Sequence, residues 1–121
     1  MSFREHLQTV CDGVDGALAC SLMAVDGIEV DTHLTSPAAV DLDLKSLLVE
    51  YSSIFRSARE AAEVHQAGGM AELSLHTDQV VTVARLISPD YFMIVALTPE
   101  GNYGKARYLL RIIAPKVRSE L

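Results

Sequence analysis

The stretch of the chain most similar to a nucleotide site is Asn102-Tyr-Gly104-Lys105-Ala106, which resembles the end of a phosphate-binding loop. The first glycine of that motif belongs five positions before Gly104, where the chain has Pro99. The lysine should be followed by a hydroxyl residue that holds Mg²⁺, and Ala106 has no hydroxyl. The sequence therefore favours a glycine-containing start of a helix over nucleotide binding.

Histidines, acids and serines supply the other candidates for chemistry. No pair of histidines has the i, i+4 spacing of a helical zinc site, and Asp41 and Asp43 lack the further ligands of a calcium loop. No serine has the flanking glycines of a nucleophile elbow. We therefore expect no enzymatic activity of the chain's own, no metal site and no cofactor; the four histidines are His6, His33, His65 and His76.

Length and charge narrow the class of protein. The 121 residues suit a single domain, 1–121, with its own core, and 10 Lys+Arg against 16 Asp+Glu argue against sequence-independent nucleic-acid binding. No apolar run is long enough to cross a bilayer and no signal-peptide core is visible, so we expect a cytoplasmic protein without membrane insertion. Cys11 and Cys20 are then expected as buried small hydrophobes rather than as a disulfide.

Positive charge gathers near the C-terminus. Residues 101–121 carry five bases and one acid, although the whole chain has a net charge of −6. Cations near the C-terminal end of a helix are typical of a solvated face, and they could also form a docking patch for an acidic partner. The sequence leaves both interpretations open. The basic residues are Lys105, Arg107, Arg111, Lys116 and Arg118.

Apolar periodicity, with the turn signal Asp26-Gly27, predicts the element order α-β-β-α-β-β-β-α. Five strands joined mainly by hairpins predict an antiparallel sheet with helices on one or both faces, an α/β fold of the α+β kind. The predicted strands cover residues 17–24, 28–33, 70–77, 80–87 and 91–98. The predicted helices begin near residue 3, at residue 42 and after residue 102.

The central predicted helix, residues 42–66, has Asp41 as its expected N-cap and ends before Gly68-Gly69. Its apolar stripe is wider than the ~100° that one sheet face requires, which favours a helix-to-helix seam in a homodimer over deep burial in a monomer. One row is Leu44, Leu47, Tyr51, Ile54, Ala58 and Ala61, and a second row is Leu48, Phe55 and Ala62. The residues alone do not say which row faces the sheet.

The strand predicted over residues 71–77 could pair with its own copy across a two-fold axis if it lies at a sheet edge. The predicted dimer interface is Leu44, Leu47, Leu48, Tyr51, Ile54, Phe55, Ala58, Ala71, Leu73 and Leu75. The polar side of the helix is either a solvated face or a platform for a partner protein, with the basic last helix as the rival surface. The platform residues are Lys45, Arg56, Arg59, Glu60 and Glu63.

Three stretches, in this order, make the chain resemble the Roadblock/dynein light-chain-seven family, which includes bacterial MglB-type proteins. They are residues 13–30, the helix that ends at Gly68-Gly69, and residues 102–110. The resemblance covers nearly the whole chain. It implies one central antiparallel sheet and a homodimer in which the second helices lie side by side and the third strands join the two sheets.

The resemblance also implies regulation of Ras-like small GTPases. Some family members are GTPase-activating partners, and others are adaptors that pair with a second Roadblock protein or with signalling proteins in cell-polarity and motility modules. Members need not supply an arginine finger, so none of Arg56, Arg59, Arg85 or Arg107 is assigned that role. We expect a non-catalytic dimeric adaptor; direct GTPase activation and small-molecule sensing are the alternatives.

Overall fold

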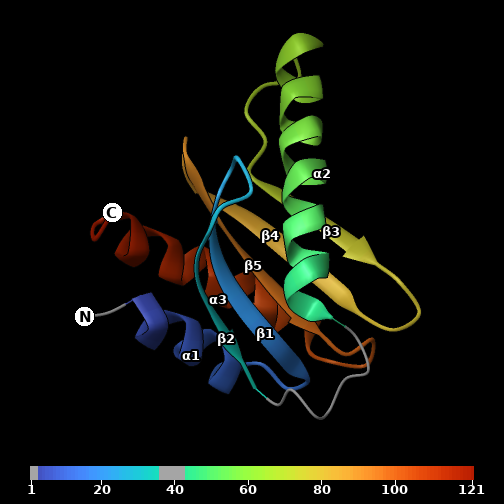
Figure 1. The fold of residues 1–121 in the computed structure, drawn as a ribbon, viewed down its shortest axis with the longest axis vertical. Helices are drawn as coiled ribbons and strands as arrows, with labels where there is room; N and C mark the ends of the chain where they lie inside the picture. Colours follow the sequence, from blue (N-terminus) through green and yellow to red (C-terminus); the bar gives the residue numbers. More distant parts are fainter. Residues whose placement is uncertain (1–2, 36–42) are drawn as a thin grey trace.

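The computed structural model describes residues 3–35 and 43–121, and within these ranges five strands form one antiparallel sheet (Figure 1). The predicted element order and fold class are confirmed. The loop expected around Pro37 lies outside the described residues. The elements are α1 (Phe3–Gly13), β1 (Ala17–Ala24), β2 (Glu29–Leu34), α2 (Leu44–Val64), β3 (Glu72–His76), β4 (Val81–Ser88), β5 (Tyr91–Leu97) and α3 (Tyr103–Arg118). The strands lie in the sheet in the order β2-β1-β5-β4-β3.

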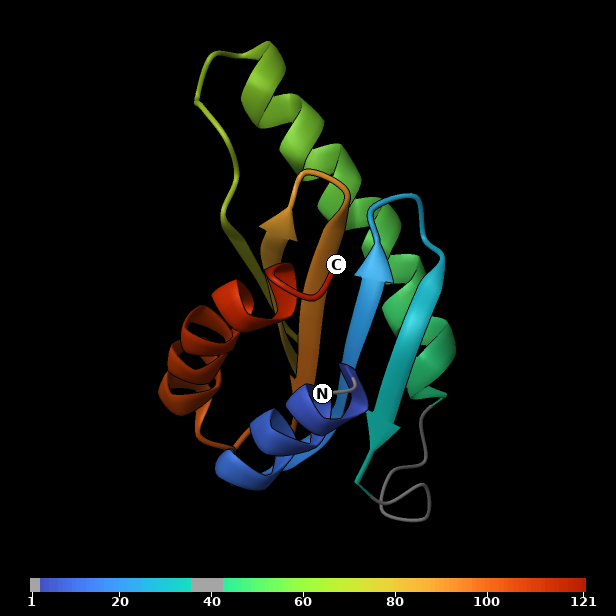
Figure 2. The same ribbon diagram turned by 90° about the vertical axis from the view of Figure 1, so that its left-hand side faces the viewer.

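Both faces of the sheet are covered, which explains why the central strands are almost continuously apolar. Helices α1 and α3 pack on one face and α2 packs on the other (Figure 2). In β5 every residue from Phe92 to Leu97 is buried, with alternate side chains entering the two cores. Strands β2 and β3 form the two edges of the sheet.

The stretch that resembled a phosphate-binding loop opens helix α3, as the sequence predicted. The Asn102 side chain accepts a hydrogen bond from the Lys105 N–H at 3.0 Å, which is the bond of an N-cap. This entrance packs closely against the chain before β1. A Cβ built on Gly16, whose φ is +87°, would lie 2.8 Å from the Gly101 Cα, so only glycine fits there.

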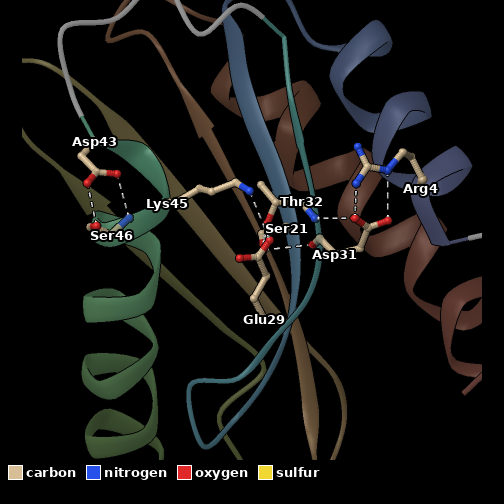
Figure 3. A network of polar contacts seen from close by, with 8 residues as sticks. All are labelled: Arg4, Ser21, Glu29, Asp31, Thr32, Asp43, Lys45 and Ser46. Atoms are coloured by element: carbon tan, nitrogen blue, oxygen red, sulfur yellow. Dashed lines mark hydrogen bonds and ion pairs between the residues drawn. The ribbon is translucent and has the colours of Figure 1, made fainter.

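Helix α2 begins at Leu44, two residues later than predicted, and its N-cap is Asp43 rather than Asp41. The Asp43 carboxylate accepts from the Ser46 N–H at 3.2 Å and from the Ser46 hydroxyl at 2.7 Å, a three-residue reach that places the cap at position 43 (Figure 3). These two hydrogen bonds hold the pKa of the Asp43 carboxyl below its ordinary value.

One apolar row of α2 attaches the helix to the sheet. Phe55 stacks on Phe92 of β5 with ring centroids 4.5 Å apart and ring planes 9° from parallel, and Leu48 is buried beside them. The C-terminal part of the helix extends beyond the sheet (Figure 1), where Val64 is 74% exposed. Packing against the chain's own sheet is therefore concentrated in the first two-thirds of α2.

Polar contacts fasten one flank of α2 to the sheet. Arg56 donates from Nη1 to the Val25 carbonyl at 3.3 Å, and Arg59 donates from Nη1 to the Pro89 carbonyl at 2.7 Å. Val25 and Pro89 lie in the turns that join β1 to β2 and β4 to β5. Lys45 pairs with Glu29 of β2 at 3.8 Å (Figure 3). This flank of the helix therefore lies toward the β2 edge of the sheet.

We predict that Phe55→Ala lowers the free energy of unfolding by about 3–5 kcal/mol, because it empties the stacked contact with Phe92 and leaves a cavity in the core. Val64→Ala, at the exposed end of the same helix, should change it by less than about 0.5 kcal/mol. Urea denaturation monitored by circular dichroism measures both. Equal costs for the two variants would contradict the packing of α2 on the sheet.

We predict that Arg59→Gln lowers the free energy of unfolding by about 1 kcal/mol, since a hydrogen bond to a turn carbonyl is lost. Lys45→Gln is the matched control, because its exposed ion pair with Glu29 contributes only about 0–0.5 kcal/mol. The same urea titrations compare the two. A loss for Lys45→Gln as large as that for Arg59→Gln would show that the Pro89 contact has no special role.

Candidate interaction surfaces

A row of apolar side chains on α2 remains accessible beside the row that packs on the sheet. Leu47, Tyr51 and Ala58 are half-buried, and Ile54 is 43% exposed. Their spacing of four, three and four residues continues to the exposed Ala61. Such alternation keeps side chains on one line along a helix and is the period of a helix–helix seam. We call Leu47, Tyr51, Ile54, Ala58 and Ala61 the α2 seam row.

Three of the residues predicted for the dimer interface belong to the chain's own core. Leu48 and Phe55 are each 1% exposed, and Leu44 is buried with them between α2 and the sheet. They leave almost no surface for a second copy to cover. The structure thus settles which row faces the sheet, and the prediction of a seam is narrowed to the α2 seam row.

Strand β3 is an edge strand, as the sequence-based hypothesis required. It pairs with β4 in the register Leu73 to Ala84 and Leu75 to Thr82, and its other side has no neighbour among the described residues. Leu73 packs against the core under α2. Leu75 is half-buried, and Ala71, just before the strand, is exposed. The backbone of β3 is therefore free to pair with a further strand.

The α2 seam row and the β3 edge lie on the same side of the molecule. Because Lys45 pairs with Glu29 of β2, one flank of α2 points toward the β2 edge. The seam row lies on the opposite flank, and β3 is the opposite edge of the sheet. A single partner surface could therefore contact both features.

The residues predicted as a partner platform have contacts within the chain. Arg56 and Arg59 hold turns of the sheet, and Lys45 pairs with β2. Glu60 is exposed, and Glu63 is exposed and lies 3.6 Å from Arg59. The sequence could not show these roles, since the acceptors of Arg56 and Arg59 are backbone carbonyls more than 25 residues away. Lys45, Glu60 and Glu63 keep exposed side chains, so the partner role of this flank stays a prediction.

The basic face of α3 borders a hollow that the sequence did not predict. Arg107 donates from Nε to Glu72 Oε2 at 2.7 Å, and Arg85 Nη1 lies 3.7 Å from Glu72 Oε1. The hydrogen bond and charge of Glu72 raise the pKa of Arg107. The hollow has a volume of about 150 Å³ and is lined by Glu72, Arg85, Gly104, Arg107, Tyr108 and Arg111.

The two cysteines are free, buried thiols. Burial, with a smaller effect of the Asp12 charge, raises the pKa of Cys11 to about 12, and burial raises that of Cys20 as well. Both thiols are therefore protonated at neutral pH and are poor nucleophiles. Within residues 3–35 and 43–121, no cluster of three or more His, Cys, Asp or Glu side chains is placed to hold a metal ion.

No helix in the described part of the chain is both long enough and apolar enough to span a bilayer. What the structure presents is a set of surfaces, and their geometry suits protein–protein contact: an apolar row on α2, an open strand edge and an arginine-lined hollow.

Comparison with known proteins shows which proteins the chain is similar to. No family model matches the chain, and no curated protein sequence matches it significantly. Among solved structures, MglC from Myxococcus xanthus is 50% identical over 100% of both chains, with a TM-score of 0.73. A Roadblock/LC7 domain from Streptomyces avermitilis is 14% identical, covers 96% of this chain and 94% of its own, and has a TM-score of 0.81.

The gliding protein MglB from Thermus thermophilus is 12% identical, with 98% of this chain and 89% of that chain covered and a TM-score of 0.81. At such low identity, the Streptomyces and Thermus proteins show a shared fold. The match to MglC is of a different kind, because half of all residues agree from one end of the chain to the other. With this identity, and with the order and topology of its elements, the protein belongs to the Roadblock/LC7 family.

Proposed function

We propose that this protein is a non-catalytic dimeric adaptor that regulates a Ras-like small GTPase in a motility or cell-polarity system. It acts by binding the GTPase or a second Roadblock protein. The relationship to MglC supports a regulatory role, and the fold is shared with an MglB described as a gliding protein. The observation that carries the proposal is the accessible α2 seam row beside the open edge of β3.

These two features together support a homodimer. In a symmetric dimer the same patch is used by both copies. Two antiparallel α2 helices would bury the seam row, and two β3 strands would pair and continue the sheet from one copy to the other. The first contact removes half-exposed Leu, Tyr and Ile side chains from water, and the second pairs a strand edge that would otherwise be open to pairing with other chains.

We prefer the adaptor role to direct GTPase activation because the arginines of α2, the helix of the proposed seam, are already engaged within the chain. Along residues 3–35 and 43–121, the arginines of α2 donate to the chain's own turns, and the thiols are buried. Direct GTPase activation remains the alternative, in which the dimer would act by positioning groups of the GTPase itself. The two roles differ in one measurable property, the rate of GTP hydrolysis by the partner.

We predict that Ile54→Glu converts the protein from dimer to monomer without unfolding it. The charge would be buried unpaired in the seam, at a cost of several kcal/mol, but stays in water in the monomer. Light scattering at low micromolar concentration should give about twice 13.1 kDa for the wild type and about 13.1 kDa for the variant.

Ser53→Glu is the matched control, since it adds the same charge at the neighbouring exposed position outside the seam row. It should remain dimeric. A monomeric wild-type protein would contradict the dimer, and a dimeric Ile54→Glu variant would contradict the seam.

We predict that the purified protein binds the cognate GTPase, or a complex of that GTPase with a second Roadblock protein, without increasing its rate of GTP hydrolysis. Single-turnover phosphate release measures the rate, and light scattering measures the complex. Faster hydrolysis with this protein alone would favour direct activation instead. The Ile54→Glu monomer serves as the control for dependence on the dimer.

A further inference from the structure

An excess of positive charge surrounds the hollow between α3 and the β3–β4 hairpin. Arg85, Arg107 and Arg111 line it together with Glu72, so three positive charges face one negative charge. This local charge of +2 contrasts with the net charge of −6 for the whole chain. Gly104, also in the lining, contributes no side chain to the space. The hollow is thus suited to receive an anionic group.

Glu72 already shows that the arginines can hold a carboxylate. Its two oxygens lie 2.7 Å from Arg107 Nε and 3.7 Å from Arg85 Nη1. Arg111 has no acidic partner among the described residues, and its guanidinium lies 5.9 Å from the centre of the Tyr108 ring. A guanidinium carries five N–H donors, so each of these arginines retains donors for a second carboxylate.

Apolar side chains flank the arginines on the outer face of α3. Tyr108 is 48% exposed and Ile112 is 40% exposed, and they lie one turn apart beside Arg111. Tyrosine and arginine are enriched where proteins contact one another. A protein partner would also cover the exposed side chains of Tyr108 and Ile112, which a free ion would leave in water. The surface therefore combines charge with apolar contact.

We propose that this surface, made of Arg85, Arg107, Tyr108, Arg111 and Ile112, docks an acidic segment of a partner protein. One carboxylate of the segment enters the hollow and pairs with the arginines, while neighbouring apolar side chains cover Tyr108 and Ile112. The hollow of about 150 Å³ is smaller than the roughly 300 Å³ of ordinary small-molecule sites, so it suits one side-chain group better than a nucleotide.

The proposal extends the adaptor function, because it states the chemistry of one partner and where on the fold that partner binds. The biological role of this docking surface rests on the proposed adaptor function. The docking surface lies on the α3 face of the sheet and the α2 seam row on the other face (Figure 2), although Glu72 in the hollow belongs to β3, the other proposed dimer contact. Binding of an acidic segment can be measured on this chain alone. A failed GTPase experiment and a failed docking experiment are therefore distinguishable.

The test uses a fluorescein-labelled peptide of alternating Glu and Leu, and the same peptide with Gln for Glu, in fluorescence anisotropy titrations against the full chain. We expect the Glu peptide to bind saturably, more weakly at high salt, and the Gln peptide to bind much less. Arg111→Glu should weaken binding of the Glu peptide about tenfold or more.

Lys116→Glu is the matched control, with the same charge change at an exposed position of the same helix outside the hollow. It should alter the affinity by no more than about twofold, the effect of a distant screened charge. Glu72→Gln should tighten binding a few-fold, because the internal competitor for Arg85 and Arg107 is removed. Circular dichroism and light scattering confirm that each variant keeps its fold and assembly.

Three results would overturn the proposal. Equal losses for Arg111→Glu and Lys116→Glu would indicate unspecific attraction to a basic helix. Equal binding of the Gln peptide would show that the carboxylates are not recognised. Displacement of the Glu peptide by millimolar inorganic phosphate, at constant ionic strength, would make the hollow a site for a free anion instead.

Discussion

The packing of α2 across the sheet, through the stacked rings of Phe55 and Phe92, is the contact on which both flanks of α2 depend. It sets the rotation of the helix about its own axis. Once Leu48 and Phe55 point into the core, the α2 seam row must lie on one flank and the arginines on the other. A helix rotated by a quarter turn would bury Ile54 and expose Leu48 instead.

The two flanks of α2 then have different roles in the structure. The flank with Arg56 and Arg59 holds the turns after β1 and β4, so it fixes the position of the helix within the chain. The opposite flank stays accessible and lies toward the open edge of β3. The same helix thus packs on the chain's own sheet and presents a surface to a partner. Its wide apolar stripe and its mixed polar side are needed for these two roles.

The two faces of the sheet differ in charge as well as in helix packing. The face under α1 and α3 carries the arginine-lined hollow, whose cations come from β4 and α3 and whose single carboxylate comes from β3. The hollow arises because β3 pairs antiparallel with β4, which places Glu72 opposite Arg85. Because Glu72 lies on β3, the hollow borders the strand edge through which the dimer is proposed to form.

Local sequence patterns were sufficient for the elements, their order and the Asn102 helix start, because periodicity and turn residues act over a few positions. The edge position of β3 was only a condition of the sequence-based hypothesis, and the sheet topology decided it. Local patterns did not predict the contacts between residues that lie far apart in the sequence. The two apolar rows of α2 have the same chemistry, so only packing against Phe92 distinguishes Leu48 from Ile54. The acceptors of Arg59 and the neighbours of Glu72 likewise come from strands and turns that meet only when the sheet forms.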